Sequence, residues 1–344
     1  MKKIFSDVLA ALLRGERVVL TAVIESAGST PRKLGSLMAV FADGHIAGSV
    51  GGGAIEFEVT RHAATLFDDE TMSQTRAYSL ANASESVDLG MICGGDVSIH
   101  FAVLEPDEWN QMVFERALAE PPEGGAWFAM RITSDASTRV SLEFLEGGHH
   151  ATVPPEKLHR RAVFERDDEN ANNFDGLLTA PMDIDGTVYI FGAGHVGREL
   201  LPAATRVGFS CVVFDDRADY VQSDLLPNAA GLICGDFYRI ADSVTFTERD
   251  YVVVVTRSHE LDYVVLTQAL PSAASYVGAM GSRRKMTIIR QRLADEAGVA
   301  AADIERLHSP IGVQIGAETP EELAVSLTAE LIQIRAERRN APEN

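Results

Sequence analysis

Residues 186–201 read GTVYIFGAGHVGRELL. A run of apolar and aromatic residues at 188–191 comes directly before three glycines in the spacing GxGxxG. Such a run without polar alternation is typical of a central parallel strand that is covered on both faces. Leu200 and Leu201 then continue a helical pattern. We therefore predict a strand, a glycine turn and a helix, which together open a Rossmann-like domain.

The three glycines of this turn have different predicted roles. Gly192 allows the tight turn after the strand, Gly194 lets a ligand phosphate approach the backbone, and Gly197 lets the helix pack closely on the strand. The helix that starts near His195 presents free N–H groups and a positive dipole end to an anion. We therefore expect a phosphate-bearing ligand here. The alternative is a doubly wound domain whose glycine turn binds nothing.

A second predicted strand, 211–214, is followed by Asp215 and Asp216. This position is about 20 residues after the glycine turn, where an acid that binds a ribose is expected. We take Asp215 as the candidate for that role. Further strands are expected at 231–234, 251–255 and 275–277.

Basic residues follow the later predicted strands, and in an open parallel sheet ligands lie outside the carboxyl ends of the strands. The candidates there are Arg257, His259, Gly281, Arg283 and Lys285. Cations at a helix N-terminus oppose its dipole, so we expect an anionic ligand to compensate them. The alternative for 283–285 is a solvated first helical turn.

Two loops in the first half of the chain also suit an anion. Strands are expected at 18–25, 37–41 and 46–50. The loop between the first two strands carries Arg32 at its tip, and the third strand is followed by Gly51, Gly52 and Gly53. Consecutive glycines before a helix leave N–H donors open to an anion or a flat ligand. The alternative is a tight connection that needs only one or two of these glycines.

Cys93 lies in the stretch MICGGD at 91–96, just before a predicted strand over 97–104. The two following glycines leave the backbone around the thiol open. Cys93 is therefore a candidate metal ligand or sulfur acceptor, because the thiolate is the reactive form in both roles. The alternative is a small buried hydrophobic residue. The sequence has no CxxC pattern, which argues against a structural zinc site.

The composition is that of an ordinary globular protein with a strong acidic excess. The 344 residues carry a formal net charge of −20, which repels nucleic acid and anionic membrane surfaces. No apolar run reaches the roughly 18 residues that a membrane span needs. The chain has three cysteines, far apart in sequence, which favours a reducing, cytoplasmic location.

The stretch ERDDENANNFDG at 165–176 is polar and acidic with little apolar periodicity. We interpret it as part of an inter-domain linker. The predicted fold class is α/β. It consists of an N-terminal α+β domain over 1–160, a linker over 161–185, and a C-terminal Rossmann-like doubly wound parallel sheet over 186–344.

Near the C-terminus, Thr319 and Glu322 form a predicted capping box around Pro320, which marks the start of the last helix. The rigid turn before this helix contains His308. A histidine there is either structural or part of a site at the mouth of the sheet.

Seven motifs in order resemble the XdhC/CoxI family of accessory proteins for xanthine dehydrogenase-type molybdenum hydroxylases. They are GSTPRKLGSLMAV, GSVGGGAIE and MICGGDV in the first half, then FGAGHVG, TRSHELD, GAMGSRRK and LHSPIGVQIGAETPEELAVSLTAE. Ser258 in TRSH stands where the family has glycine. The N-terminal domain would accordingly be CoxI-like.

The resemblance implies a chaperone without turnover. Such a protein binds the molybdenum cofactor (molybdopterin), protects it during sulfuration by a cysteine desulfurase and inserts it into a hydroxylase apoenzyme. A homodimer is possible, and the acidic charge and the lack of a long apolar run predict no nucleic-acid or membrane partner. The glycine and arginine loops would hold the molybdopterin phosphate, and Cys93 would be the residue closest to the metal chemistry.

Two further functions stay open from the residues alone. One is an NAD(P)-dependent oxidoreductase that uses the GAGHVG turn, although no Tyr-xxx-Lys pair or His–Asp hydride-transfer arrangement stands out. The other is a regulatory module that senses NAD(P) or another nucleotide. A Rossmann-like fold alone does not separate these functions.

Overall fold

The computed structural model divides into two compact units, Met1–Ile184 and Asp185–Asn344. It describes residues 1–30, 32–68, 72–79, 95–119, 126–133, 138–144, 153–154, 157–159, 161–168, 173–182 and 186–340. Among the helices in these ranges, none is both long enough and apolar enough to cross a membrane.

The second unit contains a six-stranded parallel sheet. Its strands are β10 (Thr187–Phe191), β11 (Ser210–Asp215), β12 (Gly231–Cys234), β13 (Tyr251–Val254), β14 (Tyr276–Ala279) and β15 (Leu307–His308). The strand order is β12-β11-β10-β13-β14-β15, and all neighbours are parallel. This is the Rossmann order 3-2-1-4-5-6, in which the chain switches direction across the sheet between β10 and β13. The predicted C-terminal fold class is confirmed.

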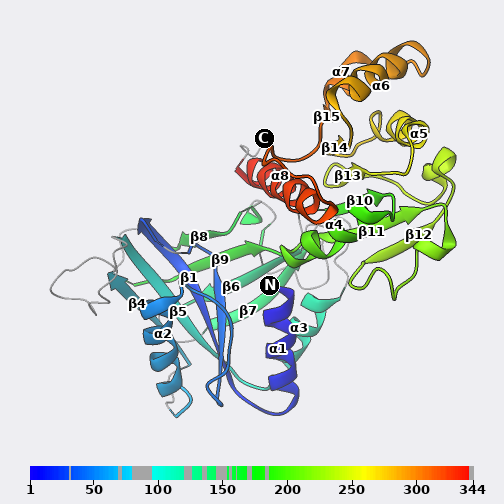
Figure 1. Ribbon diagram of the computed structural model, residues 1–344. Coiled ribbons are helices and arrows are strands. Elements are labelled where there is room, and N and C mark those ends of the chain that lie inside the picture. Colours follow the sequence, from blue (N-terminus) through cyan, green and yellow to red (C-terminus); the bar gives the residue numbers. More distant parts are fainter. Residues whose placement is uncertain are drawn as a thin grey trace. The chain divides into compact units, whose positions relative to one another are not determined.

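Helices cover both faces of this sheet (Figure 1). They are α4 (His195–Arg206), α5 (His259–Ala269), α6 (Arg283–Asp295), α7 (Ala301–Glu305) and α8 (Pro320–Asn340), with short 3-10 turns η2 (Ala218–Tyr220) and η3 (Phe237–Asp242). Val188 and Ile190 of β10 pack into the cluster that holds α4 and α8, whereas Phe191 packs toward α5 and α6. The apolar run at 188–191 therefore forms a strand that is buried on both faces, as predicted.

The first unit is built on a five-stranded antiparallel sheet. Its strands are β1 (Val18–Gly28), β2 (Leu37–Phe41), β3 (Ile46–Gly48), β4 (Ser73–Ser79) and β5 (Gly95–Leu104), in the order β3-β2-β1-β5-β4. Along β1, Val19 and Val23 face α2 (Gly53–Thr65), while Leu20 and Ile24 face the cluster of α1 (Lys2–Leu13) and α3 (Glu108–Leu118).

A second, four-stranded sheet completes this unit. It consists of β6 (Ala126–Ile132), β7 (Thr138–Phe144), β8 (Val163–Arg166) and β9 (Gly176–Pro181), in the order β7-β6-β9-β8. His100 of β5 links the two sheets. Its Nδ1 lies 2.8 Å from Thr75 Oγ1, and its Nε2 lies 2.7 Å from Thr138 Oγ1. Burial lowers the pKa of His100 to about 3, so the ring that joins the sheets is neutral.

The predicted linker over 161–185 is wrong, because β8 and β9 lie within it and pair with the sheet of the first unit. The acidic stretch is the connection between these two antiparallel strands. Two of its described acids are paired: Asp167 accepts from Arg131 at 2.9 Å, and Glu165 forms an ion pair with Lys157 at 2.9 Å. The first unit therefore extends to Ile184.

Candidate ligand site at the glycine turns

Two of the three glycines in the turn after β10 are required by the packing of the unit itself. Gly192 has φ +120°, and a Cβ there would collide with the Val255 carbonyl oxygen. A Cβ on Gly197 would collide with the Gly192 carbonyl oxygen, because α4 runs directly against the turn. Gly192 and Gly197 thus serve the tight turn and the helix–strand contact, as their spacing indicates.

Gly194 is the glycine that leaves room for a ligand. No described atom lies within 4 Å of the position that a Cβ on Gly194 would take. Gly194 is also the N-cap of α4, and no described side chain caps this helix. His195, the first helical residue, is exposed. The first turn of α4 therefore offers free N–H donors next to open space.

Asp215 is not free to bind a ribose, which corrects the predicted role of this residue. Its carboxylate is buried and accepts hydrogen bonds from Ala193 N–H at 2.8 Å and from Arg217 Nε at 2.8 Å and Nη2 at 2.9 Å. Burial opposes ionisation, but these hydrogen bonds outweigh it and lower the pKa of Asp215. Asp215 instead fixes the glycine turn against the end of β11.

Asp216 and Arg257 form a bidentate ion pair, with Nη2 to Oδ2 at 2.7 Å and a second contact from Nη1 to Oδ1. Asp216 follows β11 and Arg257 follows β13, and β10 lies between those two strands. The pair therefore crosses the carboxyl end of β10, from which the glycine turn emerges. Sequence reasoning named both residues, but it could not pair them, because 41 residues separate them.

Lys285 is not a free cation, contrary to the predicted positive cluster. Its Nζ lies 2.7 Å from the buried Oδ2 of Asp262 and 3.2 Å from the Met280 carbonyl oxygen. Thr256 Oγ1 donates to Oδ1 of the same carboxylate at 2.6 Å. This network ties the ends of β13 and β14 together. Asp262 was missed, because its partner lies 23 residues further along the chain.

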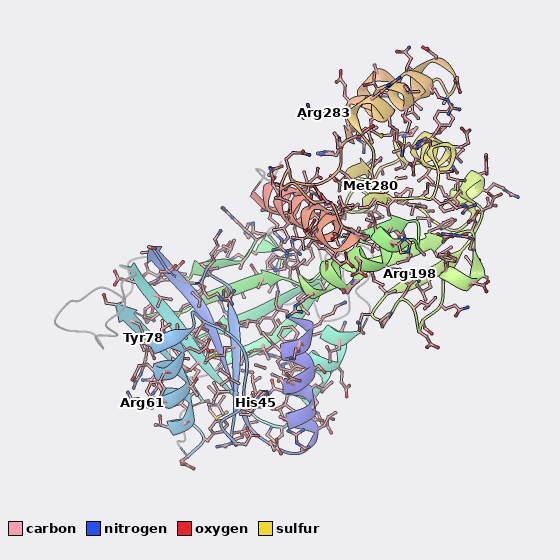
Figure 2. The ribbon with its side chains drawn as sticks, viewed as in Figure 1. His45, Arg61, Tyr78, Arg198, Met280 and Arg283 are labelled. Atoms are coloured by element: carbon pink, nitrogen blue, oxygen red, sulfur yellow. The ribbon has the colours of Figure 1, made fainter. Side chains whose placement is uncertain are left out.

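Arg283 and His259 are both exposed at the starts of helices. Arg283 opens α6, just after the turn with Gly281, and Figure 2 labels it together with Met280 and with Arg198 of α4. His259 opens α5, whose N-cap Ser258 accepts from Leu261 N–H at 3.3 Å. Ser258 therefore replaces the family glycine with a side chain that caps α5, which leaves fewer N–H donors there than at α4.

His308 lies on β15 and is held by α8. Its Nδ1 is 3.1 Å from Glu330 Oε1, the Gly312 N–H donates to Oε2 of the same carboxylate, and the ring contacts Tyr276 in a tilted arrangement with centroids 4.6 Å apart. Burial would raise the pKa of Glu330, but the hydrogen bonds from His308 and Gly312 lower it. Glu330 therefore fastens the turn before α8 to the sheet.

The predicted loops of the first unit lie at one end of its five-stranded sheet. β1 ends at Gly28, opposite Gly95 at the start of β5. Because β2 and β3 are antiparallel to their neighbours, the loop with Arg32 and the turn with Gly51 lie at this same end. Two further glycines there have positive φ, Gly52 (+73°) and Gly53 (+59°), and no described side chain caps α2.

Cys93, the candidate metal ligand, lies outside the described residues. Of the other two thiols, Cys211 is buried, and burial raises its pKa to about 12, whereas Cys234 is exposed. No group of three or more His, Cys, Asp and Glu side chains suitable for a metal occurs within the described ranges.

The sequence matches the XdhC Rossmann domain over residues 188–331 and the XdhC and CoxI family over residues 11–79. The chain belongs to the XdhC/CoxI family. The two matches fall on separate units, since the Rossmann match covers the unit of β10–β15 and the other match lies in the unit of β1–β9.

The chain is similar over nearly its whole length to proteins whose names refer to xanthine dehydrogenase or to insertion of the molybdenum cofactor. It is 28% identical to a probable xanthine dehydrogenase subunit from Bacillus subtilis over 96% of this chain and 97% of that protein. It is 22% identical to the molybdenum cofactor insertion chaperone PaoD of Escherichia coli over 94% of this chain and 86% of that protein. A crystal structure described as a xanthine dehydrogenase of Bacillus halodurans matches with a TM-score of 0.78 at 25% identity, over 98% of both chains.

Proposed function

We propose that this XdhC/CoxI protein is an accessory chaperone that binds the molybdenum cofactor and inserts it into a xanthine dehydrogenase-type apoenzyme. Membership of the family and the similarity to an insertion chaperone along nearly the full chain support this function. The distant chaperone relative is only 22% identical, so the function rests on the site as well.

The observation that carries the proposal is the open glycine turn at Gly194. Molybdopterin bears a phosphate, and the uncapped start of α4 offers N–H donors with no described atom in the way. Arg257 and the exposed Arg283 would add positive charge at the same edge of the sheet in a protein of net charge −20. These groups fit a phosphate. When bound, the cofactor would supply the molybdenum chemistry, while the residues named here would hold and orient it.

In the first unit, Arg32 and Gly51–Gly53 lie at one end of the sheet, and we propose that they form an anion-binding surface of this unit. Cys93 belongs to the segment that leads into Gly95 at that end. We propose Cys93 as the thiol that meets the metal or accepts sulfur, with a cysteine desulfurase as the sulfur donor. Its soft thiolate suits this chemistry. The chain's few, widely spaced cysteines fit a reducing cytoplasm.

An NAD(P)-dependent oxidoreductase is the second candidate, and the glycine turn is the feature that favours it. Against it stands Asp215, whose oxygens are occupied by Arg217 and Ala193, so that a dinucleotide ribose could meet an acid only at the neighbouring Asp216, which is already paired with Arg257. The same pairing of Asp215 argues against a nucleotide-sensing module. We therefore place the insertion chaperone first.

Native mass spectrometry of the protein made in a host that synthesises the cofactor tests this function. A bound molybdopterin mass supports the chaperone, a bound dinucleotide supports the oxidoreductase or sensor, and protein without either mass contradicts both. The same spectra report whether the protein is a homodimer. A Cys93→Ala variant should retain less cofactor than a Cys234→Ala variant, which removes a thiol that is exposed in the second unit. Equal retention would remove Cys93 from the mechanism.

A further inference from the structure

Three cations at the carboxyl edge of the parallel sheet are already paired with carboxylates, and only one of these pairs is open to solvent. Arg217 and Lys285 bind Asp215 and Asp262, whose side chains are 2% and 3% exposed. The Asp216 side chain is 30% exposed, and that of its partner Arg257 is 42% exposed. A ligand can therefore reach this last pair without entering the protein core.

The exposed pair of Asp216 and Arg257 also lies at the end of β10, beside the glycine turn that is proposed to bind a phosphate. It joins the ends of β11 and β13 across the end of β10, and the turn with Gly194 begins directly at that end. A phosphate on the N–H groups of α4 would lie at this crossing. An exposed ion pair contributes little to stability, so a more highly charged anion can replace the carboxylate.

We propose that Asp216 and Arg257 form a two-point recognition site for a ligand that carries a phosphate next to a hydroxyl or N–H donor. The inference rests on the proposed function and names how its site recognises the cofactor. The ligand phosphate takes the place of Asp216 on the Arg257 guanidinium, which binds phosphate in the same bidentate manner. The carboxylate that is released then accepts a hydrogen bond from the ligand's own donor.

This exchange predicts opposite effects for the two partners of one ion pair. Asp216 competes with an incoming phosphate, so removing its charge strengthens the binding of a simple anion. Arg257 provides the contact itself, so removing its charge weakens that binding. A pair with only a structural role would give the same direction of effect in both variants.

The test is calorimetric titration of the full-length protein with inorganic pyrophosphate at low salt. We expect Asp216→Asn to bind pyrophosphate about threefold to tenfold more tightly than the unsubstituted protein, and Arg257→Gln about tenfold more weakly. Glu260→Gln is the matched control, because it removes an exposed carboxylate that pairs with Arg292 in the same unit. Thermal unfolding of each variant shows whether it is folded.

A second probe, ADP, adds ribose hydroxyls to the diphosphate. Asp216→Asn should gain less affinity for ADP than for pyrophosphate, because its neutral amide oxygen is a weaker acceptor for those hydroxyls than the carboxylate. Unchanged or weaker pyrophosphate binding by a folded Asp216→Asn variant would overturn the inference, and so would equal gains with both probes. A protein that retains molybdopterin but shows no such pattern leaves the proposed function intact. If the variants show this pattern of affinities but the protein is never found with bound molybdopterin, the proposed function is contradicted and the two-point recognition site is not.

Discussion

Each unit has a glycine turn that leads into a helix, and the two turns use their glycines differently. In the second unit, side chains on Gly192 and Gly197 would collide with backbone oxygens. In the first unit, Gly52 needs its positive φ of +73°, but no described atom lies within 4 Å of where its Cβ would be. Contacts with backbone oxygens restrict Gly192 and Gly197, and Gly192 also has a positive φ, whereas Gly52 is restricted by its backbone conformation alone.

The difference shows how much of a glycine motif concerns a ligand. Two of the three glycines in GxGxxG are explained by packing within the unit, so only Gly194 is left to accommodate a phosphate. Conversely, neither positive φ nor open space at Gly52 distinguishes a binding turn from a plain connection. Substitutions at Gly52, Gly194 and Gly197 therefore measure separately the effects of backbone conformation, ligand contact and packing.

The largest effect is expected for Gly197→Ala. The added methyl group meets the Gly192 carbonyl, which the turn cannot move away, so we expect the second unit to lose about 3 kcal/mol of stability. Thermal or urea unfolding measures this loss. Gly194→Ala is the control, since its methyl group points into open space, and it should unfold almost like the unsubstituted protein. Similar stabilities for both variants would contradict the packing role.

Acid should act on the first unit through His100. Its folded pKa of about 3 lies below the unfolded value of 6.5, so the neutral ring stabilises the fold above pH 6.5, and this stabilisation is lost as the pH falls toward 3. The loss is about 1.4 kcal/mol per pH unit, or about 2.7 kcal/mol at pH 4.5. Urea unfolding at several pH values measures it.

A His100→Gln variant provides the control for that measurement. It should be less stable at pH 7 but should lack the part of the pH slope that His100 contributes between pH 6.5 and 4.5. The same slope in both proteins would show that other groups cause the acid sensitivity.

The Gly194→Val substitution tests whether the glycine turn of the second unit contacts a ligand. The variant should stay folded and lose at least about tenfold in affinity for a phosphate-bearing ligand, equivalent to about 1.4 kcal/mol, because the side chain fills the approach to α4. Titration with pyrophosphate measures the affinity. Unchanged affinity in the folded variant would leave the turn without a ligand role.

The smallest effect is expected for Gly52→Ala. Alanine at φ +73° is strained, but its methyl group touches no described atom, so we expect a loss of about 1 kcal/mol. Differential scanning calorimetry of the intact protein measures the change in the first unit. A loss as large as that of Gly197→Ala would erase the distinction between the two turns.

The sequence by itself determined the Rossmann-like domain, because an apolar strand, a glycine turn and a following helix are local patterns that span few residues. It also assigned Gly192 and Gly197 to the tight turn and the helix–strand contact, where the packing requires them, while the ligand role of Gly194 stays a prediction. It misread 161–185 as a linker, because the short strand β8 needs little apolar character and its neighbouring charges are neutralised by Arg131 and Lys157.

Only the tertiary structure decided which charged residues are already paired within the protein and which could contact a ligand. Asp215 and Lys285 looked like ligand contacts, yet they are paired with Arg217 and Asp262, and Arg257, although exposed, is paired with Asp216. These partners meet because parallel strands bring their carboxyl ends together from positions far apart in the chain. The physical reason is that charge pairing depends on distances of a few ångströms in space, whereas strand and turn patterns depend on neighbours along the sequence.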